Sequence, residues 1–425
     1  MKSALSFWLS ILAGASLSCF AQNEQPPAPA DQGSFEELPE LKASEILKPE
    51  FLKGPHFTLR EEVPTASGMN KFSIDSDYGV FEARGNAMLM QRVGEIAAIT
   101  QLKDVSRTDQ FQQSLVAAAK GPYNAAKNVV QDPGAAISGA GQGIMKFMKR
   151  TGNTLKHVSN GTTEKSSSEG TGESMIGYAR AKRQVAARMG VDPYTTNAVL
   201  QKELDGIAWA TWGGGFAFSA ATFPIGGGVG MALTATKVSN TVGQLINEKT
   251  ATELKAINRS TLRAMGVSPS DTEKFLDNDA FTPTHQTAFT QNLKALDGVE
   301  NRAAFVRSAA KNSNGEDDAL FCVLTASLLG KIHTGEKPLA RIVMLGAFPV
   351  CVAKDGTVVV ALQWDYAAWT AGAARFCEEV QRLDAESGKK GILIAISGQA
   401  SPRLKQELQA RRIAINDRVN PGPLK

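Results

Sequence analysis

The sequence predicts an α+β protein with an N-terminal β-hairpin, a central Gly/Ala-rich helical domain and a C-terminal small α/β module. Three observations lead to this expectation. Short alternating runs occupy residues 56–84, long stretches with helical periodicity follow, and β-rich runs that alternate with helical patterns begin near Pro338. A chain of 425 residues, 43% of them hydrophobic, can bury the core that such a fold needs.

The first residues have the pattern of an export signal. Lys2 is followed by the apolar run ALSFWLSILAGASL, which is short for a membrane span and ends in small residues. We therefore expect residues 1–21 to be removed as a signal peptide, with cleavage after Ala21. Retention as an N-terminal anchor is one alternative. Lipid attachment at Cys19 is another, although Ser16 stands where a lipoprotein signal usually has Leu. These residues therefore predict export from the cytoplasm.

A Pro/Glu-rich linker is expected over residues 22–55, before the first folded unit at 56–150. In that unit KFSID and GVFEAR form a hairpin, with the turn around Asp77 and Gly79. The runs NAMLMQRVGEIAAITQLKDV and DQFQQSLVAAAK have helical spacing. A Gly/Ala-rich segment that becomes apolar and then basic ends this unit, as a core helix or as a helix lying at a membrane surface.

Residues 151–175 are rich in Ser, Gly and Thr, which predicts a flexible surface loop, and residues 176–336 form the helical domain. A basic helix in this domain is expected to stop at Gly190. Asp192 and Pro193 then fit an N-cap and a first-turn proline for the next helix.

The helical domain contains the segment WATWGGGFAFSAATFPIGGGVGMALTAT, in which no charged residue occurs. Its flanks are apolar, which argues against a phosphate-binding loop. We expect two short helices packed as a buried hairpin, with small residues allowing close contact. Shallow entry of residues 207–236 into a membrane is the alternative. The glycines that would serve either helix packing or membrane contact are Gly213, Gly214, Gly215, Gly226 and Gly230.

The α/β module is expected over residues 337–425. The β-rich runs ARIVMLGAFPVCVA and TVVVALQW are joined by Lys354-Asp355-Gly356, a hairpin signal. Thr370 fits the cap of a helix, KKGILIAIS a buried strand, Ser401-Pro402 the start of a second helix, and IAIND a final strand.

Candidate site residues lie where the buried strand of this module meets the second helix. Ser397, Gly398, Gln399 and Ser401 form a candidate anion-binding loop, because free N–H groups and the helix dipole at such a point attract negative charge. Ligands of α/β sheets gather at these strand ends, and Asp365, which follows an earlier strand, could lie nearby. An ordinary helix cap at Ser401 explains the same residues without a ligand.

Motifs for other chemistry are absent from the sequence. It contains no GxSxG, P-loop, HExxH or GxGxxG pattern. Asp277, Asp279 and His285 could meet a metal only in principle, because Thr282 and Pro283 read as a helix start. We expect no metal and no cofactor. Cys322, Cys351 and Cys377 are expected as buried thiols, with one disulfide and one free thiol as the alternative.

Three stretches resemble exported proteins of Gram-negative bacteria that form an uncharacterised group with no assigned activity. They are RQVAARMGVDPYTTNAVLQKELDGIAWA, FLDNDAFTPTHQT and PLARIVMLGAFPVCVAKDGTVVVALQWDYAAWT. The resemblance covers most of the chain after about Gly68. It implies export to the periplasm or outer envelope of a Gram-negative bacterium and the unity of the chain, and it implies no chemistry.

Two functions of different classes follow. The first is a non-enzymatic envelope protein that binds a membrane surface or a protein partner of unknown identity. The alternative is an enzyme or ligand-binding protein that uses the C-terminal module on a small anionic substrate. A net charge of +4 without basic runs interleaved with aromatics argues against nucleic acid as a partner.

Overall fold

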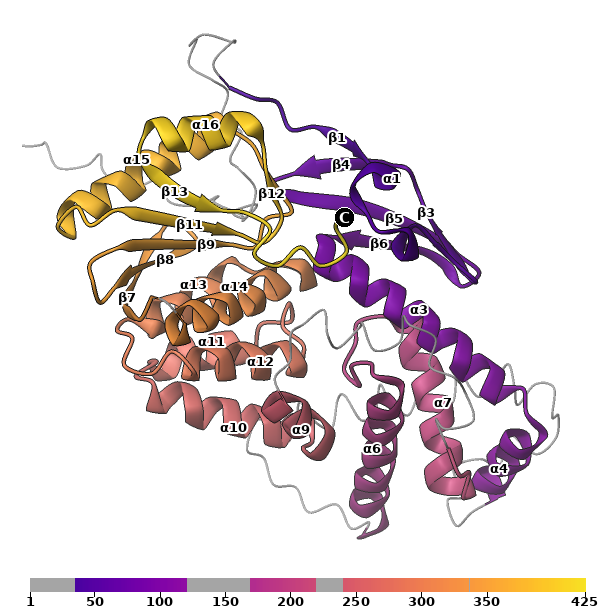
Figure 1. Ribbon diagram of the computed structural model, residues 1–425. Helices are drawn as coiled ribbons and strands as arrows, with labels where there is room; N and C mark the ends of the chain where they lie inside the picture. The colour runs from indigo at the N-terminus through magenta and orange to yellow at the C-terminus, as the bar shows by residue number, and fades with distance from the viewer. Residues whose placement is uncertain (1–34, 121–168, 219–239, 336) are drawn as a thin grey trace, which may run out of the picture.

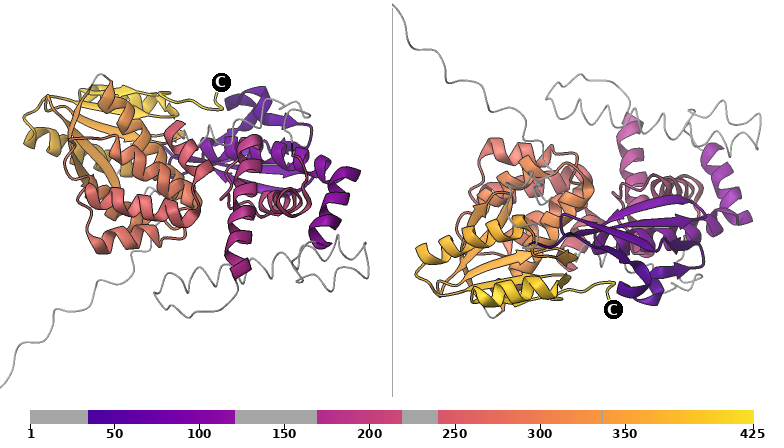
Figure 2. Two further views of the ribbon diagram at one scale, coloured as in Figure 1. Left: turned by 90° about the horizontal axis from the view of Figure 1, so that it is seen from below. Right: turned by 90° about the horizontal axis from the view of Figure 1, so that it is seen from above.

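The computed structural model describes residues 35–120, 169–218, 240–335 and 337–425. The expected signal peptide, most of the Ser/Gly/Thr loop, the basic segment before Arg150, and Gly226 and Gly230 lie outside these residues. Figure 1 shows an N-terminal sheet and a C-terminal sheet side by side, with most of the helices beneath them. The views from below and above in Figure 2 show the same division between the two halves. The α+β fold class is confirmed.

The N-terminal sheet is antiparallel and has six strands in the order β1-β4-β5-β3-β2, with β6 also paired to β5. The predicted hairpin is β5 and β6, whose turn contains Gly79 at φ 117°. The elements of this region are β1 (Glu40–Lys42), α1 (Ala43–Ile46), α2 (Pro49–Leu52), β2 (Lys53–Gly54), β3 (Phe57–Leu59), β4 (Glu62–Ala66), β5 (Met69–Ser76) and β6 (Gly79–Arg84). Residues 40–54 are therefore folded, where the sequence predicted part of a linker, because their few apolar side chains pack into the core of this sheet.

Helix α3 (Asn86–Ser106) joins two of the three hydrophobic cores. Its first half packs on the N-terminal sheet through residues such as Leu89, which is fully buried. Its second half packs on a helical cluster through residues such as Leu102. The helices of that cluster are α4 (Asp109–Lys120), α6 (Glu169–Met189) and α7 (Ala198–Gly214).

The remaining helices share one core with the C-terminal sheet, on both sides of the boundary expected at residue 337. Phe289 and Phe305 from the helices and Val359 from the sheet belong to this core, and each is fully or almost fully buried. These helices are α9 (Asn240–Glu248), α10 (Ala251–Ala264), α11 (Pro269–Leu276), α12 (Pro283–Lys294), α13 (Arg302–Asn312) and α14 (Glu316–Thr334).

The C-terminal sheet has the order β13-β11-β9-β8-β7, and its last three strands in the chain run parallel. Its crossover helices α15 and α16 cover one face, and α13 and α14 lie against the other (Figure 1). Two further short strands, β10 and β12, pair parallel with each other outside this sheet. The elements of the C-terminal half are β7 (Leu339–Leu345), β8 (Phe348–Ala353), β9 (Val358–Leu362), β10 (Tyr366–Ala367), α15 (Ala371–Glu386), β11 (Ile392–Ile396), β12 (Gln399–Ala400), α16 (Pro402–Ala410) and β13 (Ile413–Asn416).

Several predicted boundaries are confirmed by the helix caps. The side chains of Thr282, Thr370 and Ser401 accept hydrogen bonds from N–H groups in the first turns of α12, α15 and α16. One cap was wrong. Asn197 caps α7, whereas Asp192 is buried in the preceding turn and accepts hydrogen bonds from the Tyr194 N–H and the Thr284 hydroxyl. The Asp-Pro pair was misleading because it occurs both at helix starts, where the aspartate is the N-cap, and in turns.

The run ARIVMLGAFPVCVA forms two strands, β7 and β8, where the sequence showed one β-rich run. Gly346 turns the chain between them at φ 59°, a backbone conformation that glycine adopts readily. The sheet therefore has an outer strand, β7, whose far edge pairs with no strand of the described chain.

The described part of the glycine-rich segment, residues 209–218, comprises the last turns of α7 and the four residues that follow it. A methyl group at Gly214 would overlap the Ser114 carbonyl of α4, and one at Gly213 would lie 3.0 Å from the Ala118 side chain. Gly215 ends the helix in the left-handed conformation. Small residues here let α4 and α7 approach closely.

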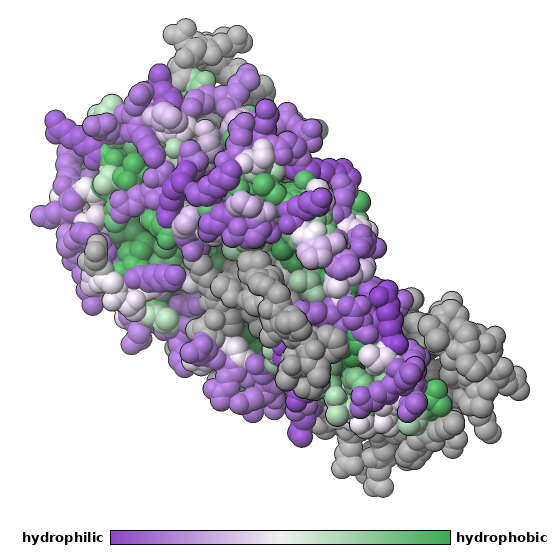
Figure 3. Space-filling model, turned by 45° about the vertical axis from the view of Figure 1, so that its right-hand side comes forward, coloured by the Kyte–Doolittle hydropathy of each residue, from purple (hydrophilic) through white to green (hydrophobic). Residues whose placement is uncertain are grey.

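Among the described residues, no helix combines the length and apolarity needed to cross a membrane. On the face drawn in Figure 3, hydrophobic residues appear in separate areas between hydrophilic ones.

Candidate functional site

The predicted anion-binding loop connects β11 to α16, and its N–H groups bond to the protein itself. Ser397, Gly398, Gln399 and Ser401 each donate to a backbone carbonyl in the segment Leu362–Ala367, at 2.8 to 3.0 Å. The Ser401 hydroxyl donates to the Glu36 carboxylate at 2.6 Å and accepts from the Leu404 N–H at 2.9 Å. The negative charge expected at the start of α16 is therefore supplied by Glu36 of the chain itself.

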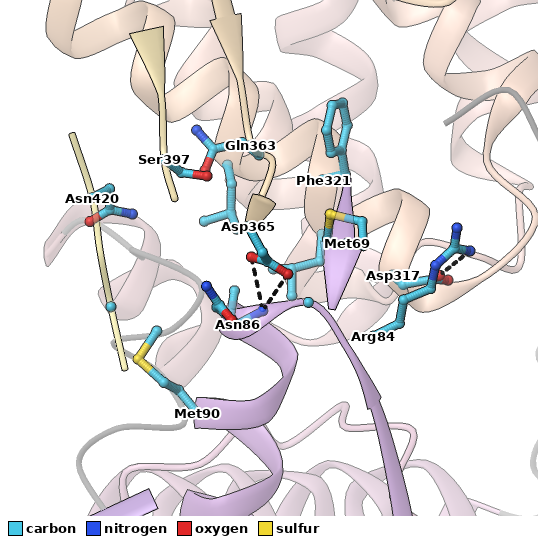
Figure 4. Close-up of a pocket in the computed structure, with 15 residues that line it drawn as sticks. Met69, Arg84, Asn86, Met90, Asp317, Phe321, Gln363, Asp365, Ser397 and Asn420 are labelled. Atoms are coloured by element: carbon cyan, nitrogen blue, oxygen red, sulfur yellow. Dashed lines mark hydrogen bonds and ion pairs between the residues drawn. The ribbon is translucent and has the colours of Figure 1, made fainter. Parts of the chain in front are cut away.

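Asp365 lies beside this loop at the junction of the two sheets (Figure 4). The hairpin turn at Gly68 reaches it, because the Gly68 carbonyl accepts the Asp365 N–H at 2.8 Å. Its carboxylate accepts the backbone N–H of Asn70 at 2.9 Å and that of Asn86 at 3.1 Å. Asn86 is the first residue of α3, whose N-cap position, Gly85, has no side chain to offer. Asp365 therefore caps a helix that lies 279 residues earlier in the chain.

Burial raises the pKa of Asp365 to about 7, although the hydrogen bonds from the Asn70 and Asn86 backbones act in the opposite direction. The side chain forms no ion pair with a described residue. A buried carboxylate with a pKa near neutrality is a frequent feature of catalytic sites, so the space around it decides what it can do.

A cavity of about 30 Å³ adjoins Asp365. Ser397 and Gln363 line it at the strand ends, and the Arg84–Asp317 ion pair, at 3.0 Å, lines the opposite side (Figure 4). Ser401 does not line it. A volume of this size holds a water molecule or two and no substrate, so Asp365 acts here as a helix cap and a link between the sheets.

A second buried polar cluster, which sequence reasoning missed, joins α3, α12, α14 and the turn before α7. Arg92 bonds to Glu95 at 2.7 Å and to Glu316 at 2.6 Å, and Glu95 also accepts the Asn197 side-chain amide at 2.9 Å. Burial raises the pKa of Asp192, in the same region, to about 7. No local sequence motif predicts this cluster, because its members lie up to 225 residues apart in the chain.

The histidine and aspartates considered for a metal do not meet. His285 is buried in the first turn of α12, and burial lowers its pKa. Asp277 forms a surface ion pair with Lys255 at 2.7 Å, and Asp279 is exposed. In the ranges that the structure describes, no group of three His, Cys, Asp or Glu side chains is arranged to hold a metal ion.

The three cysteines of the described chain are buried thiols, without a disulfide between them. Burial raises the pKa of Cys322 and Cys351 to about 12 and that of Cys377 to about 11. Thiols with such values are poor nucleophiles. They act as small hydrophobic residues of the core.

An open groove of about 860 Å³ runs between α13 and the outer strand β7. The residues that line it include Ala304, Arg307, Ser308 and Lys311 of α13 and Arg341 and Met344 of β7. Its size is in the range of known ligand sites. Nothing in the sequence alone marked this groove, because it depends on the packing of a helix against a sheet edge.

The edge of β7 in this groove is only partly covered. Glu300 pairs with it like a single residue of a parallel strand: its N–H donates to the Ala340 carbonyl at 2.8 Å, and its carbonyl accepts the Ile342 N–H at 3.0 Å. The Asn301 side-chain amide donates to the Ile342 carbonyl on the same edge at 2.9 Å. Because strand residues alternate, the N–H and carbonyl of Met344 point to the same side as those of Ile342, away from β8. The open edge therefore continues beyond Ile342.

Comparison with known proteins gives no match to a protein-family model, to a curated protein or to a solved structure. The resemblance to exported proteins of Gram-negative bacteria stays a prediction.

Proposed function

We propose that the chain is a non-enzymatic exported envelope protein that binds a protein partner in the groove between α13 and β7. One observation carries the proposal: a hollow of about 860 Å³ lies beside the outer edge of β7, where the Met344 backbone points away from β8 and bonds to no described residue outside the sheet. Extended segments of partner proteins add to such edges through main-chain hydrogen bonds.

The charges around the groove favour an acidic partner. Lys311 and Arg341 form no ion pair with described residues, and Arg307 shares its charge with Asp271 at 3.0 Å. Glu300 is the acidic residue that lines the groove. The net positive lining would attract a segment that carries carboxylates and would orient it.

The alternative, an enzyme or binding protein for a small anion in the C-terminal module, has less support. The N–H groups of the predicted loop are bonded internally, and the cavity beside Asp365 has a volume of about 30 Å³. Membrane binding through the glycine-rich segment stays an expectation, since residues 219–239 lie outside the described chain. Flotation of the purified protein with liposomes tests that alternative.

Photo-crosslinking in intact cells tests the proposed function. A photoreactive residue at position 311, in the groove, should give a discrete protein adduct, and one at Val80, which is exposed on β6, should not. Met344→Pro removes the outward N–H while leaving the β7–β8 ladder paired, so the adduct should weaken severalfold. Equal adducts from both positions, or none from position 311, would contradict a partner in this groove.

A further inference from the structure

The described chain begins with a segment that bridges the two sheets. Glu36 contacts Trp369, just before α15, and Ser401, at the start of α16. Only four residues later β1 pairs antiparallel with β4 of the N-terminal sheet. The Thr65 N–H also donates to the Pro39 carbonyl at 3.3 Å. Residues 36–42, which we name the clasp, therefore touch both halves of the molecule within seven positions.

The binding site for Glu36 consists of groups that suit a carboxylate. Its Oε2 atom accepts hydrogen bonds from the backbone N–H of Trp369 and from the Ser401 hydroxyl, both at 2.6 Å. Trp369 is 3% exposed and Ser401 is fully buried, so both donors are fixed by the surrounding fold. The Ser401 hydroxyl caps α16 at the same time, so the positive end of that helix dipole faces the charge of Glu36.

The backbone of Glu36 adds direction to this contact. Its N–H donates to the Trp369 carbonyl at 2.8 Å, so Glu36 pairs with Trp369 through main chain and side chain together. The Arg411 guanidinium stacks on the Trp369 ring at 4.4 Å and holds this part of the surface in place. An isolated anion could not form the main-chain bond, whereas a glutamate in an extended peptide can.

We propose that these groups form a binding socket for a glutamate of an extended peptide, and that Glu36 of the clasp is its resident ligand. The clasp also covers the β4 edge through β1. When the clasp leaves, the socket and the β4 edge open together, and an acidic extended segment can take its place. The clasp thus controls access to a second peptide-binding surface, separate from the groove at β7.

Hydrogen exchange on the full-length protein tests the clasp, with Glu36→Ala compared with Glu37→Ala. Glu37 is the adjacent exposed carboxylate and serves as the matched control. In Glu36→Ala we expect exchange of the Trp369 amide and of residues 37–42 to rise about tenfold or more. In Glu37→Ala exchange should stay within about twofold of the wild type. Wild-type exchange rates in Glu36→Ala would overturn the proposal.

A labelled peptide with the sequence of residues 31–42 tests the socket by fluorescence anisotropy. It should bind full-length Glu36→Ala protein, in which the socket is free, at least tenfold more tightly than it binds the wild type. The same peptide carrying alanine at position 36 should lose this binding, and the peptide with alanine at position 37 should keep it. Equal binding of the three peptides, or of one peptide to both proteins, would show that the socket does not select a glutamate.

Discussion

Asp365 is one of two buried aspartates whose ionisation should be visible in solution. Its folded-state pKa of about 7 lies above the ~3.9 of an unfolded aspartate, so the folded protein holds the proton more tightly. That stabilisation is fully present below about pH 4 and is lost as the pH rises through 7. Asp192, whose pKa is also raised to about 7, acts in the same window.

We therefore expect the free energy of unfolding to fall between pH 5 and pH 7, by at most roughly 1.4 kcal/mol per pH unit for each of these groups. The side chain in Asp365→Asn cannot ionise, so the free energy of unfolding of this variant should fall less steeply with pH than that of the wild type, whatever its absolute stability. Urea unfolding at four pH values measures the slope, and Asp279→Asn, at an exposed carboxylate, is the control. If Asp365→Asn keeps the full wild-type slope, the carboxylate does not titrate in this window.

Residues with local roles were predictable, and residues with distant partners were not. Thr282, Thr370 and Ser401 were identified as caps because a cap acts within three residues. Asp365 was placed near the strand ends by topology alone, but its role as a cap of α3 needs the tertiary fold. The partner of Ser401, Glu36, lies 365 residues away, and no sequence pattern joins them.

At the scale of elements, the contact of α7 with α4 depends on the absence of side chains. Gly214→Ala places a methyl group on the Ser114 carbonyl and should cost about 1–3 kcal/mol of stability through overpacking. Gly206→Ala, in the same helix, meets nothing within 4 Å and should stabilise the protein by roughly 0.5–1 kcal/mol. Thermal melting followed by circular dichroism compares them. Equal melting temperatures would mean that α4 does not pack on α7 at this point.

Elements were predictable where periodicity or turn chemistry is strong. The β5–β6 hairpin, α3 and α4, and the Asp355-Gly356 turn between β8 and β9 were all expected. The division of one β-rich run into β7 and β8 was not, because its turn contains only Gly346 as a signal. The groove between α13 and β7 exists only because β7 is a separate outer strand, so the sequence did not predict the groove either.

At the scale of the whole molecule, the segment after β13 completes the core of the N-terminal sheet. Leu424 is 6% exposed within that core and bridges to Leu47. Leu424→Ala should cost about 2–5 kcal/mol through the cavity it leaves. Val419→Ala, at a 40% exposed position of the same segment, should change stability by less than about 0.5 kcal/mol. Urea unfolding measures both, and similar losses would indicate that Leu424 is not part of this core.

Export itself is tested by the intact mass of the protein recovered from cells. The short apolar run before Ala21 predicts a mature chain that begins at Gln22. A mass that includes Met1 would contradict processing. A lipid-modified chain beginning at Cys19 would move the cleavage site and make the protein a lipoprotein.

The position of Leu424 also means that the N-terminal sheet cannot complete its core before the last residues of the chain are available. The ribosome delivers the N-terminal sheet first, yet that sheet lacks part of its core until residue 424 has emerged. The hydrogen bonds of Glu36 likewise form only after Trp369 and Ser401 have been synthesised. Pairings across such long stretches of chain form slowly, because the intervening loop must first be closed. If the chain is exported as proposed, this slow pairing leaves more time for an unfolded chain to cross the membrane before its core closes.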